Sequence, residues 1–342
     1  MATTTFVSVT EMARLVRDLG LKTCIAGVVE KLEEDYGRWE TFQKVARTAN
    51  HCDLGVVELM PSSTDEEFAF KYVNGHPKNY LHGMSTVMAF GALSDLTTGW
   101  PNLLSEMTLL TAIRTAATSV FVAKLLARPD SKRMAMIGCG SQSEFQIVAF
   151  NELMGVREFA VFDTDPHAAA KLKRNLGHLN ITICESTREA VRGADIVTTC
   201  TADKTKATIL TGDMIEPGMH INAIGGDCPG KTELAADVLT KGNVYVEYEP
   251  QTRVEGDIQQ MPADFPVTEL WRVLQQPSAG RTTETEVTIF DSVGFALEDF
   301  SALRWVYQMC QKHAYGEPID LMPIMPDVKD LYGHSGLVLS LV

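Results

Sequence analysis

Hydrophobic residues recur along this chain with two different periods. Residues 55–60 and 67–73 alternate apolar and polar side chains as β-strands do, and the polar loop between them predicts a hairpin. Residues 86–93 and 102–104 flank a second turn in the same way. Residues 24–39 instead carry apolar side chains at helical spacing. The N-terminal part is therefore expected to combine helices with a largely antiparallel sheet.

A long alanine-rich helical pattern over residues 108–127 ends this part, because Pro129 cannot continue a helix. From about residue 130 onward, short apolar runs alternate with helical segments, which indicates a parallel, doubly wound sheet. Ligands of such sheets bind beyond the carboxyl ends of the strands. One further helical pattern covers residues 299–311, and a proline-rich tail follows it.

These changes of pattern predict an α/β fold with two domains, since 342 residues exceed one ordinary core. The doubly wound parallel sheet, a Rossmann-like domain, is expected at residues 130–314. An α+β domain with an antiparallel sheet is expected to join residues 1–129 to residues 315–342. In this arrangement the tail packs back on the first domain.

A glycine turn lies near the middle of the chain. The apolar run 134–137 ends in Gly138-Cys139-Gly140, and the helical pattern of residues 142–153 follows. Gly138 would permit the tight turn, Gly140 would let the backbone approach a pyrophosphate, and the helix N–H groups would face the phosphate charge. A third glycine is expected where Ser143 stands, so the turn alone is an incomplete dinucleotide-binding motif.

Asp163 strengthens this interpretation. It ends the next apolar run, residues 158–162, near the position where an acid that binds the ribose 2′-hydroxyl is expected, about 20 residues after the turn. An alternative is that Asp163 only caps the helix containing residues 167–172. The turn and the acid together predict NAD, and NAD rather than NADP, because a carboxylate repels a 2′-phosphate.

Composition excludes several other classes of protein. The net charge of −14 repels nucleic acid and anionic membranes, so neither is an expected partner. No apolar run approaches the roughly 18 residues that span a bilayer, and the N-terminus does not resemble a signal peptide, so we expect a cytoplasmic protein. The seven cysteines form no Cys-x-x-Cys pair or Cys/His cluster, which favours neither disulfides nor a metal site.

Three cations stand in apolar or strand-like surroundings: Arg47, Lys71 and Arg114. Arg114 is the most informative, because a guanidinium on a mostly apolar helix is costly to bury unless an anion pairs with it. Together the three could bind a substrate carboxylate. Each could also be a surface side chain that reaches solvent along its apolar stem.

Asp227 follows two glycines at the end of the apolar run 218–224. A carboxylate at that edge of the sheet would meet a nicotinamide, where it could take a proton from an amine or a water and return it. The alternative is that Asp227 only braces its loop.

Four stretches resemble the ornithine cyclodeaminase and mu-crystallin family. They are residues 70–77, 138–143, 222–234 and 246–253, and the most specific is GGDCPGKTEL at 225–234. The resemblance covers nearly the whole chain except the tail after about residue 327, and it is closest to the bacterial ornithine cyclodeaminases.

The resemblance implies conversion of L-ornithine to L-proline and ammonia with bound NAD⁺ that is reduced and reoxidised in each turnover. Hydride leaves the substrate Cα, the δ-amine attacks the resulting imine, ammonia departs, and hydride returns to the cyclic imine. It also implies a homodimer joined through the first domain, which would then serve both substrate binding and dimerisation.

Site residues carry over from the family position by position. The resemblance assigns acid/base chemistry to Asp227 and the substrate carboxylate to Arg47, Lys71 and Arg114. It places Glu58 near a cationic end of the substrate and Val293 beside the substrate. The implied cofactor contacts are Thr86, Arg114, Ser141, Gln142, Asp163, Thr201, Ile221, Asn222, Ala223, Ile224, Lys231 and Ser292, in addition to Gly138 and Gly140 of the glycine turn.

Related activities stay open at this point. A lysine cyclodeaminase, a ketimine reductase or an alanine-type dehydrogenase would use a similar site, and one methylene of substrate length is worth only about 1–3 kcal/mol. A non-catalytic, mu-crystallin-like NAD(P)H-binding protein is the alternative from another class. Asp163 argues against NADPH, and the intact set of Asp227 and three cations favours an enzyme.

Overall fold

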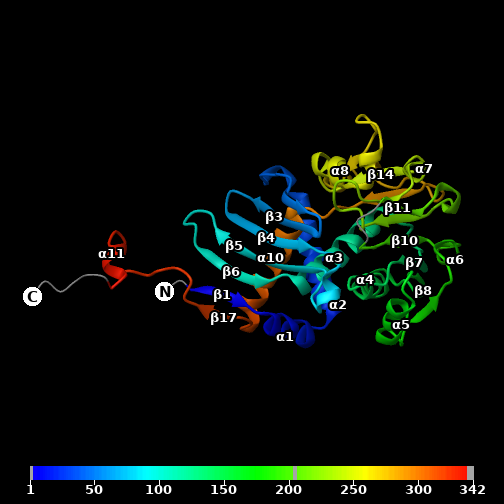
Figure 1. Ribbon diagram of the computed structural model, residues 1–342. Helices are drawn as coiled ribbons and strands as arrows, with labels where there is room; N and C mark the ends of the chain where they lie inside the picture. Colours follow the sequence, from blue (N-terminus) through cyan, green and yellow to red (C-terminus); the bar gives the residue numbers. More distant parts are fainter. Residues whose placement is uncertain (1–2, 203–205, 337–342) are drawn as a thin grey trace, which may run out of the picture.

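The computed structural model describes residues 3–202 and 206–336, and it contains two large β-sheets with helices packed between and around them (Figure 1). The predicted domain ranges also include residues 1–2, 203–205 and 337–342, which lie outside the described residues. The α/β class with a parallel sheet and an antiparallel sheet is confirmed.

The first sheet is mostly antiparallel, as predicted. Its strand order is β17 (Glu317–Ile319), β1 (Thr4–Val7), β6 (Pro101–Glu106), β5 (Val87–Asp95), β4 (Glu67–Gly75), β3 (Gly55–Ser63) and β2 (Thr48–Cys52). The predicted hairpin is β3 and β4, in which Glu58 lies opposite Val73 and Met60 opposite Lys71. The pairing of β1 with β6 is parallel, which no local pattern predicted.

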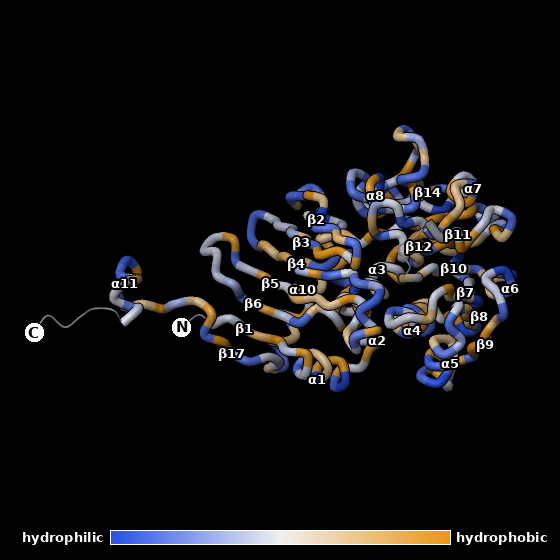
Figure 2. Tube along the Cα trace, in the orientation of Figure 1, coloured by the Kyte–Doolittle hydropathy of each residue, from blue (hydrophilic) through white to orange (hydrophobic). Residues whose placement is uncertain are grey.

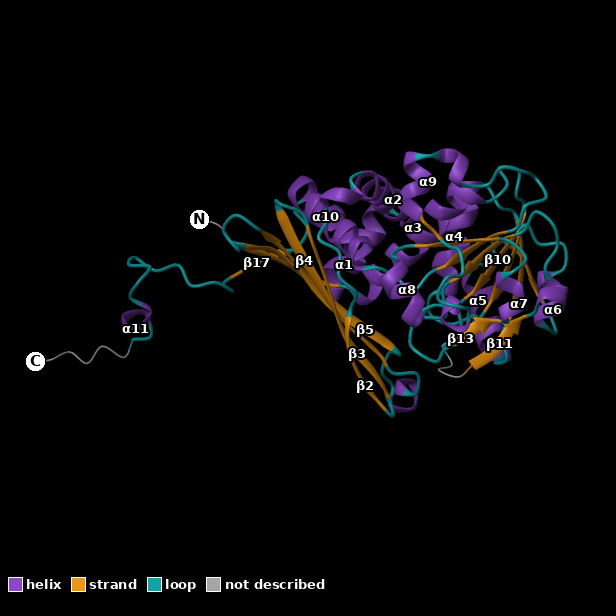
Figure 3. Ribbon diagram, turned by 90° about the horizontal axis from the view of Figure 1, so that it is seen from above, coloured by secondary structure: helices purple, strands orange, loops and turns teal. Residues whose placement is uncertain are grey.

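Helices cover only one face of this sheet (Figure 3). They are α2 (Leu21–Gly37), α3 (Thr108–Leu126) and α10 (Ala296–His313), with α1 (Val9–Leu19) beside them. Side chains alternate accordingly, because β-strand residues point to opposite faces in turn: Lys71 is buried, whereas Leu59 and Phe90 on the other face are exposed. The sequence placed α10 in the second domain, but the helix packs against α2, α3 and the strands β3 to β6.

The second sheet is parallel throughout. Its order is β15 (Thr268–Glu269), β14 (Asn243–Val246), β16 (Thr288–Asp291), β12 (His220–Ala223), β10 (Ile196–Thr199), β7 (Arg133–Ile137), β8 (Glu158–Phe162) and β9 (Asn180–Ile183). The chain builds outward from β7 to β9 and then returns to β10 on the other side. The strand order therefore reverses between β7 and β10, and such a switch point is where doubly wound sheets bind ligands.

Shorter elements complete the described chain. The remaining α-helices are α4 (Ser143–Met154), α5 (Pro166–Asn175), α6 (Thr187–Val191), α7 (Ala236–Leu239), α8 (Glu249–Glu255), α9 (Leu270–Gln275) and α11 (Leu331–His334). A two-stranded sheet pairs β11 (Lys206–Leu210) with β13 (Thr232–Leu234), and 3-10 turns occur at Trp39–Thr41, Asn79–His82, Gly212–Met214, Asp257–Gln260 and Pro277–Ala279.

One hydrophobic core joins the two sheets. It includes residues of α2, α3 and α10 together with residues of β7, β8 and α4 (Figure 2). Within the described ranges, α3 is the one helix long and apolar enough to cross a membrane, and most of it is buried in this core. Packing between the two sheets therefore accounts for the apolar character of α3.

The tail only partly follows the prediction. Its first residues form β17, which pairs antiparallel with β1 at the edge of the first sheet. The following residues 320–336, with α11, run away from the body of the molecule (Figure 1). The expectation that the tail packs back on the first domain is thus correct for β17 and wrong for the segment after it.

Candidate active site

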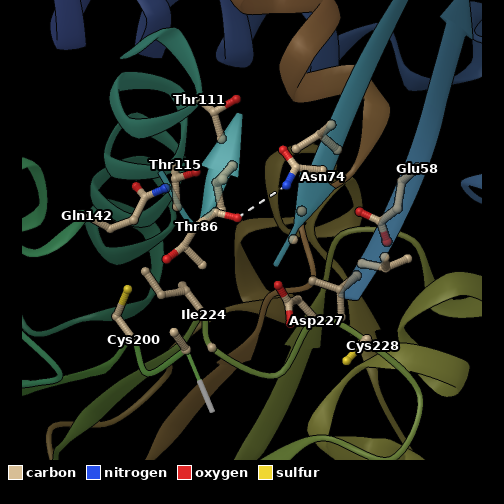
Figure 4. Close-up of a pocket in the computed structure, with 18 of the residues that line it drawn as sticks. Glu58, Asn74, Thr86, Thr111, Thr115, Gln142, Cys200, Ile224, Asp227 and Cys228 are labelled. Carbon is tan, nitrogen blue, oxygen red and sulfur yellow. Dashed lines mark hydrogen bonds between the residues drawn. The ribbon is translucent and has the colours of Figure 1, made fainter. Parts of the chain in front are cut away.

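A cavity of about 240 Å³ lies where the inner face of the first sheet meets the carboxyl edge of the parallel sheet. Strands β3 and β4 and helix α3 line one side, and the loops after β7, β10, β12 and β16 line the other. Figure 4 shows Glu58 of β3 and Asp227 of the loop after β12 bordering the same space. The cavity therefore combines residues from both predicted domains.

The glycine turn after β7 has the conformation that the sequence predicted. Gly138 has a φ of 96°, and a Cβ at this position would collide with the carbonyl oxygen of Cys200 at the end of β10. Only glycine tolerates both conditions. Nothing lies within 4 Å of the position of a Cβ on Gly140, and Ser141 and Gln142 line the cavity just before α4 begins.

Asp163 braces this turn. Its carboxylate accepts hydrogen bonds from Cys139 N–H at 2.6 Å and from Asp165 N–H at 2.8 Å. The helix that follows, α5, is capped by Asp165, whose side chain accepts from His167 N–H. The alternative role of Asp163 as the cap of α5 is therefore not supported.

Lys71 and Arg114 meet at one carboxylate of α10. Asp299 Oδ1 lies 2.7 Å from Lys71 Nζ and 3.1 Å from Arg114 Nε. Arg114 also pairs with Glu298 at 2.8 Å. Both cations line the cavity and both are buried, so neither is the solvent-reaching side chain that the sequence left open.

Arg47, which stands just before β2, also lines the cavity. Its guanidinium lies 3.1 Å from Glu58 and 3.1 Å from Glu255, and it also donates to the carbonyl groups of Val293 and Gly294 after β16. Only 5% of the Arg47 side chain is exposed. These contacts connect the start of β2 to the loop after β16. The Arg47 guanidinium is buried and still lines the cavity.

Burial shifts the pKa values of this cluster. Burial lowers the pKa of Lys71 to about 8, and the positive charge of Arg114 acts in the same direction. Burial raises the pKa of Glu298 to about 8 and that of Glu255 to about 7. Burial therefore disfavours the negative charge of Glu298 and Glu255 beside the three cations, which favours one further carboxylate there.

Asp227 follows Gly225 and Gly226 in the loop after β12, and its side chain is 51% exposed. Its Oδ1 lies 3.2 Å from Nζ of the buried Lys231, which also donates to the Thr201 carbonyl at 3.0 Å. Glu233 accepts from both the N–H and the hydroxyl of Thr201. Lys231 and Glu233 therefore hold the loop of Asp227 against the end of β10.

The sequence comparisons agree with this geometry. A model of the ornithine cyclodeaminase/mu-crystallin family matches residues 9–314. The chain belongs to this family. It is 52% identical over 330 residues to the ornithine cyclodeaminase of Agrobacterium fabrum (strain C58), a match that covers 96% of this chain and 93% of the relative.

Solved structures of other proteins share the fold. A structure that explains recognition of L-lysine, L-ornithine and L-2,4-diaminobutyric acid by lysine cyclodeaminase superimposes with a TM-score of 0.91 at 28% identity and covers 96% of this chain and 99% of its own. An archaeal alanine dehydrogenase dimer with bound NAD gives a TM-score of 0.83 at 28% identity, covering 93% of this chain and 99% of its own.

Most of the predicted residues of this family member come together in the cavity. The lining includes Arg47, Glu58, Lys71, Thr86, Arg114, Gly140, Ser141, Gln142, Thr201, Ile224, Asp227, Lys231, Ser292 and Val293. Gly138 and Asp163 instead form and brace the turn behind it. Ile221 and Ala223 are buried in the core on β12, and Asn222 of that strand donates to the Thr198 hydroxyl at 3.4 Å.

Sequence reasoning missed several residues of the site. Thr111 and Thr115 line the cavity without a local signal, whereas Asn74 and Cys228, which also line it, stand within the family stretches 70–77 and 222–234. Asn74 Nδ2 lies 3.5 Å from the Thr86 carbonyl (Figure 4). Glu298 and Asp299, which pair with Lys71 and Arg114, lie on α10. The helical pattern that predicted this helix was apolar and gave no indication of these acids. Glu233 stands within the most specific family stretch, so that stretch could have identified it.

Proposed function

We propose that this chain is an ornithine cyclodeaminase that converts L-ornithine to L-proline and ammonia. The observation that carries the proposal is one cavity that joins the glycine-turn edge of the parallel sheet to Asp227 and three buried cations. Identity of 52% to ornithine cyclodeaminases over nearly the whole chain supports the same reaction.

NAD fits the residues present. Gly140 leaves open space beside the turn after β7, the Cys139 side chain is buried away from it, and the residues just before α4 line the cavity, as a pyrophosphate requires. Asp163 places a carboxylate at the end of β8, where it suits a ribose hydroxyl and disfavours a 2′-phosphate. When bound, NAD supplies the redox chemistry by taking hydride from the substrate Cα and returning it to the cyclic imine.

The three cations bind the substrate carboxylate in this proposal. Lys71 and Arg114 are fixed side by side by Asp299, and Arg47 approaches with its guanidinium held by Glu58 and Glu255. This arrangement lowers the cost of ordering the site when substrate binds, because the side chains are already fixed. Glu58 then faces a cationic end of ornithine, and Val293 packs beside the substrate.

Asp227 is the acid and base of the proposed mechanism. Its carboxylate accepts a proton from the δ-amine as that amine attacks the imine carbon, and it donates the proton to the departing α-amine, which leaves as ammonia. Its half-exposed position leaves room for such an exchange, and Lys231 orients one carboxylate oxygen. The remaining cofactor contacts of the proposal are Thr86, Ser141, Gln142, Thr201, Ile224 and Ser292. Ile221, Asn222 and Ala223 lie on β12, which pairs with β10 and β16 on its two sides, so in this proposal they support Ile224 and do not reach the cavity themselves.

We also propose a cytoplasmic homodimer. The uncovered face of the first sheet carries exposed Leu59, Met88 and Phe90, and Phe90 stacks on Tyr72 with ring centroids 5.0 Å apart. A contiguous apolar face of this kind is typical of a subunit interface. The similar archaeal alanine dehydrogenase is a dimer.

A lysine cyclodeaminase is the second candidate, because the similar structure of that enzyme recognises both L-lysine and L-ornithine. The test is to incubate the protein with L-ornithine, L-lysine or L-alanine and a catalytic amount of NAD⁺. We expect ornithine to give equal amounts of ammonia and proline without net NADH. Faster cyclisation of lysine, or NADH accumulating in proportion to product, would contradict the assignment.

A further inference from the structure

The segment after β17 exposes apolar side chains at regular intervals. Exposed fractions are 44% for Leu321, 50% for Ile324, 78% for Val328 and 62% for Leu331. We call residues 320–336 the C-terminal arm. Of the 17 large apolar side chains exposed in the described ranges, five lie on the arm, which is far more than its length predicts. Such density on one segment marks a surface that is covered in the working protein.

The arm is anchored at one end only. Strand β17 pairs with β1 at the edge of the first sheet, and the chain beyond it leads away from the body (Figures 1 and 2). Lys329 N–H donates to Asp327 and Gly333 N–H donates to Asp330, so these hydrogen bonds lie within the arm itself. Helix α11 has four residues, and so short a helix needs tertiary packing to persist in water.

We propose that the C-terminal arm of each chain packs against the first domain of a second copy of this chain. This proposal rests on the homodimer proposed above, and it adds the C-terminal arm as a part of the contact between the two subunits. In Figure 3 the arm leaves on the side of the first sheet that helices do not cover. That side carries the other main group of exposed apolar side chains, including Leu59, Met88 and Phe90.

A second copy fits both surfaces at once. In a twofold dimer each chain contributes one arm and one uncovered sheet face. The arm of each chain then packs on the sheet face of the other, so both contacts are identical and no further copy can add to the dimer. A fully extended arm of this length spans about 50 Å, which is enough to cross onto a neighbouring domain. The uncovered face also contains a hollow lined by Val57, Tyr72, Met88 and Phe90.

The first test compares dissociation constants of the dimer by analytical ultracentrifugation. A triple variant, L321S/I324S/V328S, removes apolar arm side chains and leaves β17 intact. Two substitutions at similarly exposed residues outside the arm, V9S/V254S, give the matched control. We expect the arm variant to raise the dissociation constant at least tenfold and the control to change it less than threefold. A wild-type dimer that the arm variant leaves unchanged contradicts the arm proposal alone.

The second test identifies what the arm contacts. A photo-crosslinking amino acid replaces Ile324, and chains of normal and heavy isotope content are mixed, refolded together and irradiated. We expect crosslinked peptides of mixed mass that join the arm to the first domain. Crosslinks of uniform mass, or none, overturn the proposal. A wild-type chain that sediments as a monomer contradicts the proposed homodimer, and with it the arm contact, but leaves the proposed reaction untouched.

Discussion

At the scale of single residues, burial shifts the pKa values of the ionisable groups in the site. Lys71 is 1% exposed, and burial lowers its pKa to about 8, whereas Asp299 at 2.7 Å supports the charged form. The lysine is therefore charged at neutral pH but close to losing its proton. A cation that must bind a carboxylate stops doing so once it is neutral.

We therefore predict that the KM for L-ornithine rises as the pH passes through about 8. With a pKa of about 8, roughly nine-tenths of Lys71 is neutral at about pH 9, so KM should rise about tenfold over the value near pH 6.5. Lys71→Arg should move this rise to higher pH, because a guanidinium stays charged. Steady-state kinetics across this range measures the effect, with Lys124→Arg as an exposed control. Identical profiles for Lys71→Arg and the wild type would contradict the role of Lys71.

The sequence identified the cations but not their partners. Arg114 could be predicted because a guanidinium on an apolar helix needs an anion. Its anions, Glu298 and Asp299, lie more than 180 residues away, and no local pattern records such a pairing. The same reason explains why Glu255 was missed as a partner of Arg47.

At the scale of elements, the glycine turn joins β7 to α4 and packs against the end of β10, the neighbouring strand at which the sheet order reverses. Gly138 approaches the backbone of Cys200 at the end of β10, so the turn and β10 fit together only without a side chain. Gly140 stands in open space and faces no such restriction within the protein itself. The two glycines are therefore expected to serve different purposes, one in folding and one in cofactor binding.

Gly138→Ala and Gly140→Ala test this difference. Gly138→Ala should lower the free energy of unfolding by about 1–3 kcal/mol, because alanine is strained at positive φ and collides with a carbonyl group. Gly140→Ala should leave the free energy of unfolding unchanged but weaken NAD binding about tenfold or more. Urea unfolding and calorimetric titration with NAD⁺ measure the two effects. Equal stability of the two variants would contradict the strain argument.

Elements with a strong local period were predicted almost to the residue, as β8 and α3 show. Of the apolar run 218–224, only His220–Ala223 pair in the sheet. Gly225 and Gly226 follow the strand, and a Cβ on either would lie close to the carboxylate of Glu233 or Asp257, so the loop that presents Asp227 needs residues without side chains there. Strand β16 was not predicted, since its position between β12 and β14 depends on long-range order.

At the scale of the whole molecule, the site exists only where two domains meet. Helix α10 carries Glu298 and Asp299 to the cations of the first sheet, although it follows the parallel sheet in the chain. We propose that the first domain includes this helix, so that the chain returns to it at about residue 295. Sequence periodicity identifies a helix but not the sheet on which it packs. It also does not give the position of a segment with little regular structure, such as the C-terminal arm.

The central claim is that Asp227 exchanges protons with the substrate in a cavity shared by both domains. The most direct measurement is the rate of proline formation from L-ornithine by Asp227→Asn, with NAD affinity measured in parallel. Loss of a general acid and base costs about 10²- to 10⁴-fold, so kcat should fall at least 100-fold while NAD binds within about threefold of the wild type. Asp130→Asn, an exposed acid outside the cavity, serves as the control and should keep full activity. Near-normal proline formation by Asp227→Asn would contradict the account.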